Sequence, residues 1–596
     1  MTDAATAITG GASLSRFRPL AAPLAAAVFA AILVAVGPYL LGHYAINILI
    51  RAFFYAVVAL TLDILWGYAG ILTFGQAAFF GIGAYAAALI FTHLGFTTET
   101  IALAFLLAIV VPMICGLLVG WLSFYTGASP LYASVVSLAF PIVISQLIYS
   151  GGTFTGSSSG LVGYETFDIR TKTWFWIAGG GLVLAGTLLA VLMRSELGRL
   201  IVAVRDNETR LAYLGIDPNK VKIALTAGLA GIAGLAGLGY ASFSGVVAPE
   251  ITGFVFGTQL IIYVALGGRG TLIGPIVGTL GIELMSAYLS GDLPYVWQLI
   301  VGLVFVVVII VMPKGLAPLL AGAVGRLLPL PRLASTARIV PATDPVATDK
   351  ASIDIRDVTK SFGSLKVLQG IDLSIAGGEL VSLVGPNGAG KTTLMRCLGD
   401  GAERSGGSVT IDGHDIGARP PHSIVGFGLG RKFQMATIFE SLTVGESLRV
   451  ARARIDGLSP VLPISDIALP ATALAVMEAT GLGDHLDREV RHLSHGQKQA
   501  LELTMVLAMS PRVILLDEPT AGLTKVDRQR IGGALASLAR DHGLAVILVE
   551  HDLDFVRTIS SRVVVLHQGR ILLDGTVDEV VHSELVKSVY SGAGHD

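Results

Sequence analysis

The chain of 596 residues has only two cysteines and few charged residues for its length. Cys115 and Cys397 fall in different halves, so they predict neither a structural disulfide nor a metal site. Charged residues make up 14% of the sequence, and the net charge of −2 says nothing about partners. No basic stripe indicates nucleic-acid binding. The 53% hydrophobic content is too high for a soluble protein of this length.

The apolar residues are concentrated before about residue 320, whereas the chain after about residue 350 alternates charged and apolar residues like a soluble α/β domain. A bilayer crossing needs about 20 mostly apolar residues. Ten segments meet this need, and they are 20–41, 46–66, 70–94, 101–123, 130–149, 174–193, 222–243, 251–268, 273–290 and 295–312. We therefore predict an all-α membrane domain of about ten transmembrane helices over residues 1–318.

The assignment of spans in the stretches 251–290 and 20–41 depends on more than length and apolar content. The stretch 251–290 is too long for one crossing, and Arg269 flanked by glycines belongs at a water-facing turn, so we divide it at Gly267–Gly270. The run 20–41 follows Arg16 and Arg18, is too long for a typical signal peptide and lacks a clear small-residue cleavage site, so we interpret it as a retained span. Eight crossings remain possible if 70–94 is re-entrant and another weak segment fails to cross.

Basic residues set the predicted orientation. The segment 194–222 carries six of them, namely Arg194, Arg199, Arg205, Arg210, Lys220 and Lys222, whereas 95–100 has none. The positive-inside rule places 194–222 in the cytoplasm, together with Arg269. Ionisable residues at membrane depth are Arg51, Asp63 and Glu283, and burial in lipid is so costly that a paired or pathway-facing role is the default hypothesis. For Arg51 and Asp63, snorkelling from opposite ends of one span is the alternative.

A proline-rich connector with Pro329, Pro331, Pro341 and Pro345 joins the two parts, and its composition predicts an extended tether over 319–350. The rest of the chain, 351–596, contains Leu380–Val384, which has the pattern of a buried strand.

A phosphate-binding motif, G-x-x-x-x-G-K-[ST], follows that strand. Its glycines let backbone N–H groups turn toward phosphates at a helix N-terminus, Lys391 supplies a positive charge, and Thr392 offers a hydroxyl to Mg²⁺. The predicted nucleotide-binding residues here are Gly385, Pro386, Asn387, Gly388, Ala389, Gly390, Lys391, Thr392 and Thr393.

The stretch Val513–Glu518 is predicted to be a second apolar strand that ends in two consecutive carboxylates, Asp517 and Glu518. We expect Asp517 to hold Mg²⁺ through water and Glu518 to act as the base that polarises the attacking water. The sequence therefore predicts an α/β P-loop NTPase that hydrolyses ATP with Mg²⁺.

Residues 351–594 resemble the nucleotide-binding domain of ABC transporters. The resemblance implies that Phe362 stacks on adenine, that Gln434 is the Q-loop glutamine and a Mg²⁺ ligand, and that His551 is the switch histidine. It also makes Leu493–Gln497 the signature motif, with His495 where glycine is more usual. In this family Ser494, Gly496 and Gln497 complete the ATP site of a second domain, so a dimer is implied. Thr524 stands where the D-loop aspartate is expected, and we take it as a subfamily trait.

The membrane part resembles the branched-chain amino acid permease family. The segments that carry this resemblance are Gly67–Gln76, Phe79–Tyr85, Thr155–Leu161, Val264–Pro275 and Pro313–Leu316. The loop from Arg194 to Asp217 matches that family's cytoplasmic coupling region, which implies docking on the ATPase; a basic loop that serves only topology is the alternative. The segment Val577–Gly592 resembles the C-terminal extension of the family's ATPases.

Together these resemblances imply an ATP-driven importer of branched-chain or hydrophobic amino acids in the bacterial inner membrane, with permease and ATPase fused. They imply a second permease and a second ATPase, or a second copy of this chain, and a periplasmic binding protein; lipid is a partner and nucleic acid is not. Asp63–Tyr68 and the form of the signature motif lean toward urea and short-chain amide importers, which remain the alternative. An ABC exporter is disfavoured, because such proteins usually have six spans.

Overall fold

The computed structural model describes residues 21–125, 130–292, 296–312, 315–317, 337–342, 351–459, 466–521 and 524–591. The chain divides into two compact units. The first contains residues 1–194 and 219–333, and the second contains 195–218 and 334–596. The short segment 195–218 thus belongs to the same unit as the C-terminal part of the chain. Arg16, Arg18 and most of the predicted connector lie outside the described residues.

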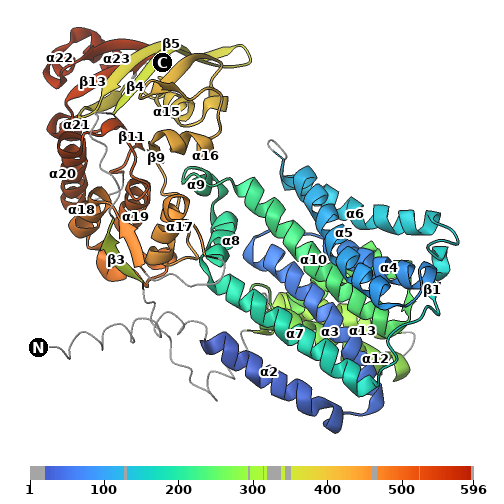
Figure 1. The fold of residues 1–596 in the computed structure, drawn as a ribbon. Coiled ribbons are helices and arrows are strands. Elements are labelled where there is room, and N and C mark those ends of the chain that lie inside the picture. The colour runs from blue at the N-terminus through green and yellow to red at the C-terminus, as the bar shows by residue number, and fades with distance from the viewer. Residues whose placement is uncertain are drawn as a thin grey trace, which may run out of the picture. The chain divides into compact units, whose positions relative to one another are not determined.

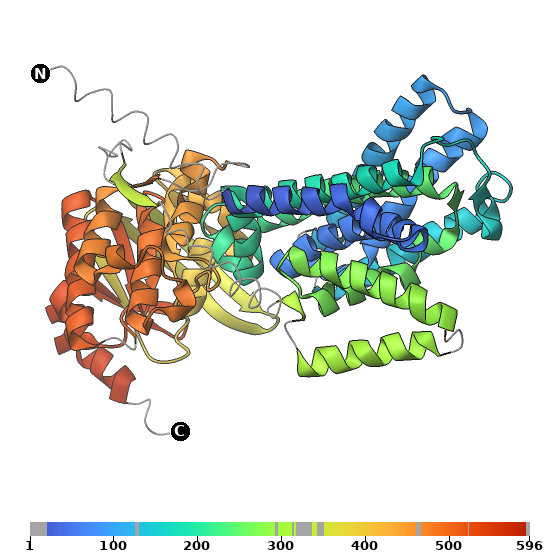
Figure 2. The same ribbon diagram turned by 90° about the horizontal axis from the view of Figure 1, so that it is seen from below.

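The first unit is a bundle of helices (Figures 1 and 2). Its helices are α2 (Ala21–Leu40), α3 (His43–Asp63), the π-helical turn η2 (Ile64–Tyr68), α4 (Gly75–His93), α5 (Thr98–Phe124), α6 (Pro130–Ser150), η3 (Ser157–Ser159), α7 (Thr171–Arg194), α10 (Pro218–Ser244), η4 (Pro249–Thr252), α11 (Phe254–Gly267), α12 (Ile273–Asp292) and α13 (Trp297–Val311). Two short strands, β1 (Leu161–Val162) and β2 (Val246–Val247), pair antiparallel.

Each of the ten predicted spans coincides with a helix of this unit. Within the described residues, eight helices are long and apolar enough to cross a membrane. The other two, α11 with 14 residues and α13 with 15, are shorter. At 1.5 Å per residue they extend about 21–23 Å, less than the roughly 30 Å of a hydrocarbon core. The helical membrane fold is confirmed, and the count of ten crossings stays a prediction.

The predicted division of 251–290 is confirmed, because α11 ends at Gly267 and α12 begins at Ile273. Asp63, at the end of α3, holds the intervening turn. Its Oδ1 accepts a hydrogen bond from the backbone N–H of Gly270 at 2.5 Å, and its Oδ2 accepts one from Leu272 at 3.2 Å. A Cβ on Gly67 would lie 2.4 Å from both Gly270 N and Asp63 Oδ1, so only glycine allows this approach. Asp63 therefore has a structural role in the turn, in place of the snorkelling position considered from the sequence.

Arg51 and Glu283 pair with each other instead of lying apart in lipid. A guanidinium nitrogen of Arg51 on α3 is 3.7 Å from Glu283 Oε2 on α12. The Tyr263 hydroxyl on α11 donates to Glu283 Oε1 at 2.5 Å. Three helices thus meet at one carboxylate inside the bundle.

The second unit is an α/β domain whose helices begin with α8 (Glu196–Asp206) and α9 (Glu208–Ala212). Its other helices are α15 (Lys391–Gly399), η5 (Gly401–Glu403), α16 (Pro421–Ile424), η6 (Val425–Phe427), α17 (Val444–Asp456), α18 (Ala471–Thr480), η7 (Leu482–His485), η8 (Val490–His492), α19 (His495–Leu507), α20 (Lys525–His542), α21 (Leu553–Ile559), α22 (Val577–His582) and α23 (Glu584–Ser591). Its strands are β3 (Arg338–Pro341), β4 (Ser352–Phe362), β5 (Leu365–Ala376), β6 (Leu380–Val384), β7 (Gly406–Ile411), β8 (His414–Asp415), β9 (Leu429–Lys432), β10 (Asp466–Leu469), β11 (Val513–Asp517), β12 (Ala545–Val549), β13 (Arg562–His567) and β14 (Arg570–Gly575).

The main sheet of this unit has the strand order β14-β13-β6-β12-β11-β9. All pairs in it are parallel except the edge pair β13–β14. The strands β6, β11 and β12 are buried at every residue, as expected for the centre of a sheet covered on both faces. Parallel strands end at one edge, so the residues that follow β6, β9, β11 and β12 meet there.

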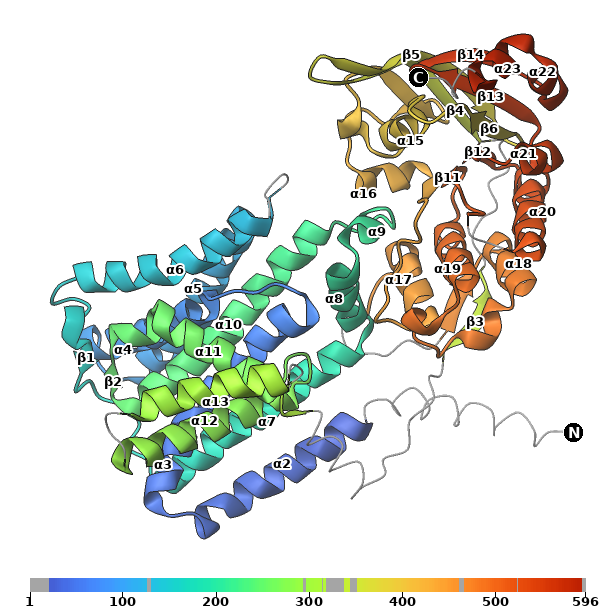
Figure 3. The same cartoon turned by 180° about the vertical axis from the view of Figure 1, so that it is seen from behind.

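A second, antiparallel sheet has the order β5-β4-β7-β8. Figure 3 shows the helices α17, α18 and α19 grouped away from β4 and β5. One finding corrects the predicted tether. Residues Arg338–Pro341, inside the segment we expected to be unfolded, form strand β3 and pair in parallel with β10. The proline-rich composition was misleading, because Pro341 is the last residue of β3 and so removes no hydrogen bond from the interior of the strand.

Candidate active site and coupling segment

The phosphate loop connects β6 to α15 at the carboxyl edge of the main sheet. Gly385, Gly388 and Gly390 have φ values of 152°, 80° and 103°. A Cβ on Gly385 would lie 2.1 Å from the Leu566 carbonyl oxygen, so this glycine is needed for close packing as well as for its backbone angle. The Lys391 ammonium donates to the carbonyls of Gly385 at 2.6 Å and Pro386 at 3.0 Å. Burial lowers the pKa of Lys391, and the charges of Glu518 and Asp517 oppose that shift.

Asp517 ends β11 and is almost fully buried. Its Oδ1 accepts no hydrogen bond from the described residues. Burial raises the pKa of this carboxyl, while the nearby Arg431 opposes the shift. A buried oxygen without a donor needs a cation or an ordered water. The residues therefore fit the predicted Mg²⁺, which Asp517, Thr392 and Gln434 would hold and which would neutralise phosphate charge when bound.

The three residues predicted as catalytic come together around one carboxylate. Glu518 Oε1 lies 2.7 Å from His551 Nε2, and Gln434 Nε2 donates to Glu518 Oε2 at 2.9 Å. Glu518 directly follows β11, His551 is the second residue after β12, and Gln434 is the second residue after β9. A carboxylate held at both oxygens is oriented to accept a proton from a water molecule.

The backbone at Glu518 is strained. Its φ of 44° lies in the left-handed region, which a non-glycine residue rarely adopts, and its N–H donates to the Val549 carbonyl at 2.9 Å. Such strain concentrates at functional sites, where surrounding structure maintains it. Glu550 directly follows β12, and its carboxylate accepts a hydrogen bond from the Thr520 hydroxyl at 2.7 Å. Burial raises the pKa of Glu550, and the bonds from Thr520 oppose the shift.

The remaining predicted nucleotide residues lie on other parts of the unit. Ser494 caps α19, with its hydroxyl accepting from the N–H of Gln497 at 3.3 Å and its own N–H donating to Gln497 Oε1 at 3.1 Å. Phe362 is exposed at the end of β4, and the Lys360 ammonium lies 4.7 Å from its ring centroid. Ser494 is exposed too, so the signature motif is presented at the surface of the unit. Residues 522 and 523, next to Thr524, lie outside the described residues.

The segment 195–218 packs on the ATPase through a buried charge cluster. The guanidinium of Arg210 on α9 pairs with the carboxylate of Glu502 on α19, and both side chains are fully buried. Arg210 also donates to the carbonyls of Arg431 at 3.0 Å and Thr437 at 2.7 Å. Glu502 in turn accepts from the backbone N–H of Phe433 at 3.2 Å. Since Phe433 precedes Gln434, the contacts run from the coupling segment to the residue that holds Glu518.

The aromatic and cationic side chains of this cluster stack closely. The rings of Tyr213 and Phe433 meet edge to face with centroids 5.0 Å apart, and the Tyr213 hydroxyl accepts from Arg431 at 2.9 Å. Lys432 lies 3.8 Å from Glu502. Burial, followed by the positive charge of Arg210, lowers the pKa of Lys432 to about 7.

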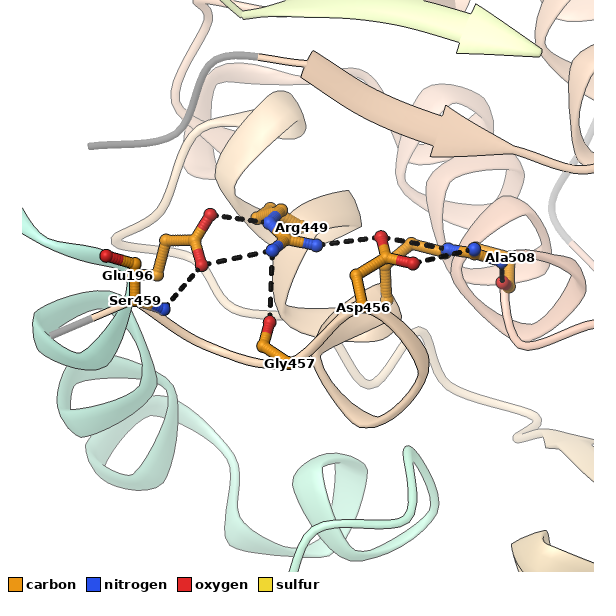
Figure 4. Close-up of polar contacts among 7 residues, drawn as sticks. Glu196, Arg449, Asp456, Gly457, Ser459 and Ala508 are labelled. Carbon is orange, nitrogen blue, oxygen red and sulfur yellow. Dashed lines mark hydrogen bonds and ion pairs between the residues drawn. The ribbon is translucent and has the colours of Figure 1, made fainter. Parts of the chain in front are cut away.

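A second contact of the coupling segment lies at the start of α8 (Figure 4). The Glu196 carboxylate accepts from Arg449 Nε at 2.6 Å and Nη2 at 3.1 Å, in a bidentate arrangement, and from the Ser459 N–H at 2.9 Å. Asp456 accepts from Arg449 at 2.8 Å on the other side. At the end of α8, Asp206 accepts from the backbone N–H of Ser441 at 2.7 Å. The predicted docking of this segment on the ATPase is thus observed at both ends of α8.

The sequence did not indicate Glu196, Arg449 or Glu502. The partners are separated by hundreds of residues, and a lone charged residue on a helix is usually solvated. One signal was present: Glu502 is the one charged residue of the stretch Ala500–Leu507, which is otherwise apolar except for Thr504, and a buried charge is kept only if it is paired.

Comparison with known proteins finds a family match for each of the two parts of the chain. The profile of the branched-chain amino acid transport system / permease component family matches residues 44–309, and that of the ABC transporter family matches 368–521. The chain is 33% identical over 248 residues to the high-affinity branched-chain amino acid transport ATP-binding protein BraF of Pseudomonas aeruginosa, covering 40% of this chain and 97% of that protein. It is 30% identical over 248 residues to LivG of Escherichia coli K12, a protein of the same description, with the same coverage. A solved structure of the ADP conformation of an ATP-binding cassette of an ABC transporter aligns with a TM-score of 0.35 and 25% identity, over 41% of this chain and 99% of that one.

The apolar helical unit, the phosphate loop and the paired carboxylates define a membrane protein with an ABC-type, transport-coupled ATPase. The chain belongs to the branched-chain amino acid transport family of ABC transporters, with its permease component and its ATP-binding component joined in one polypeptide.

Proposed function

We propose that this chain is the fused permease and ATPase subunit of an importer that moves branched-chain or other hydrophobic amino acids across the bacterial inner membrane. Residues 1–318 would form the permease and 351–596 the ATPase, with the cytoplasmic side defined by the segment 195–218. The observation that carries the proposal is the chain of contacts from Arg210 through Glu502 and Phe433 to Gln434. It joins a loop of the permease sequence to the catalytic Glu518.

The nucleotide chemistry follows from the side chains at the carboxyl edge of the main sheet. The loop Gly385–Thr392 and Thr393 would bind the phosphates, and Phe362 would stack on adenine. Glu518 would accept the proton of the attacking water, with Gln434 and His551 holding it in place. His551 would also steady the γ-phosphate, where charge develops during transfer.

The exposed signature motif supports a two-ATPase assembly. Ser494, Gly496 and Gln497 would act on ATP held by a second ATPase, which is either another subunit or a second copy of this chain. A second permease and a periplasmic binding protein would complete the importer, because the binding protein delivers substrate to the outer side.

Substrate class is supported by the relatives, whose names specify branched-chain amino acids for transport. The urea and short-chain amide alternative rests on Asp63–Tyr68 and on the form of the signature motif. Asp63 weakens that alternative, since both of its carboxylate oxygens accept backbone hydrogen bonds in the α11–α12 turn.

The decisive experiment is reconstitution of the full chain with its partner subunits and binding protein in proteoliposomes. Radiolabelled leucine, isoleucine, valine, urea and acetamide are offered from the binding-protein side with ATP inside. We expect ATP-dependent uptake of the amino acids and none with Glu518→Gln. Uptake of urea or acetamide alone would overturn the substrate assignment, and uptake that survives Glu518→Gln would overturn the ATP-driven mechanism.

A further inference from the structure

The charged pair Arg51–Glu283 lies deep in the membrane unit. Glu283 is near the middle of α12, a helix of 20 residues. Arg51 lies about 12 Å along α3 from its first residue, at 1.5 Å per residue. Ionisable groups at such depth are costly in lipid and are retained where they face water, a partner or a substrate.

The pair is also open on one side. The Glu283 side chain is 10% exposed within the unit, but that of Arg51 is 45% exposed. Most of α3 is buried, and the exposed positions of its first half are the polar residues His43, Tyr44, Asn47 and Arg51, of which His43, Asn47 and Arg51 are four residues apart on one face. This exposed stripe is unlike a lipid-facing surface such as that of α2, where Val28, Phe29 and Ile32 are exposed. The Arg51 stripe therefore fits an aqueous path better than lipid.

An aromatic cluster adjoins the pair. Tyr55 lies one turn after Arg51 on the same face of α3. Its ring centroid is 5.6 Å from that of Tyr240 and 4.8 Å from that of Phe256, and Phe80 contacts all three rings. An adjacent positive and negative charge beside aromatic rings matches the chemistry of a zwitterion with an apolar side chain.

We propose that Arg51 and Glu283 form a substrate subsite on the permeation path that takes the head group of an α-amino acid. The Arg51 guanidinium would donate to the substrate carboxylate, and Glu283 would accept from the substrate ammonium. The exchange keeps every charge paired, because one internal ion pair is replaced by two ion pairs to the substrate. Tyr263 would hold Glu283 in place through its 2.5 Å hydrogen bond, and the cluster around Tyr55 would contact the apolar side chain.

This inference rests on the proposed function and deepens it, because it assigns the substrate contacts in the permease. The test uses the reconstituted importer with Arg51→Gln, Glu283→Gln and the control Tyr44→Phe. Tyr44 also joins α3 to α12, through a 3.1 Å hydrogen bond to the Ala287 carbonyl, but without charge. We expect leucine uptake to fall at least tenfold in both charge variants and to stay within twofold of wild type in Tyr44→Phe.

A structural role for the pair makes a different prediction. The exchanged pair Arg51→Glu with Glu283→Arg would restore uptake if only the ion pair mattered, whereas the subsite predicts that uptake stays low because the charges that meet the substrate carboxylate and ammonium have changed places. Restored uptake in the exchanged variant, or normal uptake in either single variant, would overturn the inference.

A measurement on the unaltered importer covers the case in which a variant fails to fold. Diazirine-bearing photo-leucine is crosslinked during turnover and the modified peptides are mapped. We expect label on α3, which carries Arg51 and Tyr55, or on α4, α10 and α11, which carry the rest of the aromatic cluster, and we expect excess leucine to suppress it. Leucine uptake with label confined to other helices would overturn this inference alone, whereas absence of leucine uptake by the wild-type importer would overturn the proposed function as well.

Discussion

The guanidinium of Arg210 and the carboxylate of Glu502 form an ion pair in which both side chains are completely buried. The pair joins a helix of the coupling segment to the helix that begins at the signature motif. Because Glu502 also binds the backbone of Phe433, a displacement of either helix must disturb the Q-loop or break the pair. The arrangement links the coupling segment to the Q-loop within the second unit.

Removing one member of this pair should be costly. Arg210→Met leaves Glu502 as a buried carboxylate that has lost its close partner, and we expect a loss of about 3–5 kcal/mol in the free energy of unfolding of the second unit. The control is Arg205→Gln, which removes a partly exposed ion pair with Asp206. We expect this change to lower the free energy of unfolding by at most about 1 kcal/mol. Thermal and denaturant melting of the purified full chain measures both.

Adding Glu502→Gln to Arg210→Met removes the buried charge and keeps an acceptor for Phe433. We expect the double variant to recover most of the lost stability. A double variant less stable than Arg210→Met would contradict the buried-charge explanation.

Glu518→Gln should stop hydrolysis without preventing ATP binding. The amide cannot accept a proton from water, so the hydrolysis rate should fall by about 10²–10⁴-fold, the usual contribution of a general base. Phosphate release and equilibrium ATP binding by the assembled importer separate the two effects. Glu440→Gln changes an exposed acid of the same unit, paired with Lys498, and should leave hydrolysis within twofold. Equal losses in both variants would argue against the assigned role of Glu518.

Gly67→Ala should weaken the membrane unit through the turn between α11 and α12. The new methyl group would lie 2.4 Å from Gly270 N and from an oxygen of Asp63, both of which are fixed by their mutual hydrogen bond. We expect a lower melting temperature in detergent. Gly181→Ala in α7 is the matched control, because its Cβ would meet nothing within 4 Å and alanine favours helix. A melting temperature for Gly67→Ala equal to that of Gly181→Ala would contradict the packing described for this turn.

Cys397 should be inert at neutral pH. It is fully buried on α15, and burial raises the pKa of its thiol to about 11. The thiolate is the reactive form, so alkylation should increase about tenfold for each pH unit up to that value. Mass spectrometry of iodoacetamide-treated protein with Cys115→Ala checks this. Modification at pH 8 as fast as in the denatured chain would contradict it.

The sequence motifs predicted the ATP site because each residue expected to be catalytic lies at, or within two residues of, the end of a buried strand. Asp517, Glu518 and His551 could be assigned from local order and from family resemblance, and the parallel sheet brings them together without further information. The predicted spans likewise follow from long apolar runs. The helices α11 and α13 are shorter than a bilayer crossing needs, so their apolar composition does not decide whether they cross the membrane.

Contacts between distant segments could not be predicted in the same way. The pairs Arg210–Glu502 and Glu196–Arg449 depend on how the chain returns to itself, and nothing near these residues in the sequence encodes their partners. Strand β3 was missed for a different reason. A four-residue strand can lie between prolines, so a composition typical of linkers does not exclude β-pairing.

The pairing of β3 with β10 has a practical consequence for producing the ATPase separately. A fragment that starts at Ala351 would lack Arg338–Pro341 and leave that edge of β10 without its parallel neighbour. Unpaired strand edges recruit other chains and promote aggregation. The N-terminal boundary of a separate ATPase fragment therefore lies before Arg338 and not at Ala351, and part of the predicted connector is a structural element of the second unit.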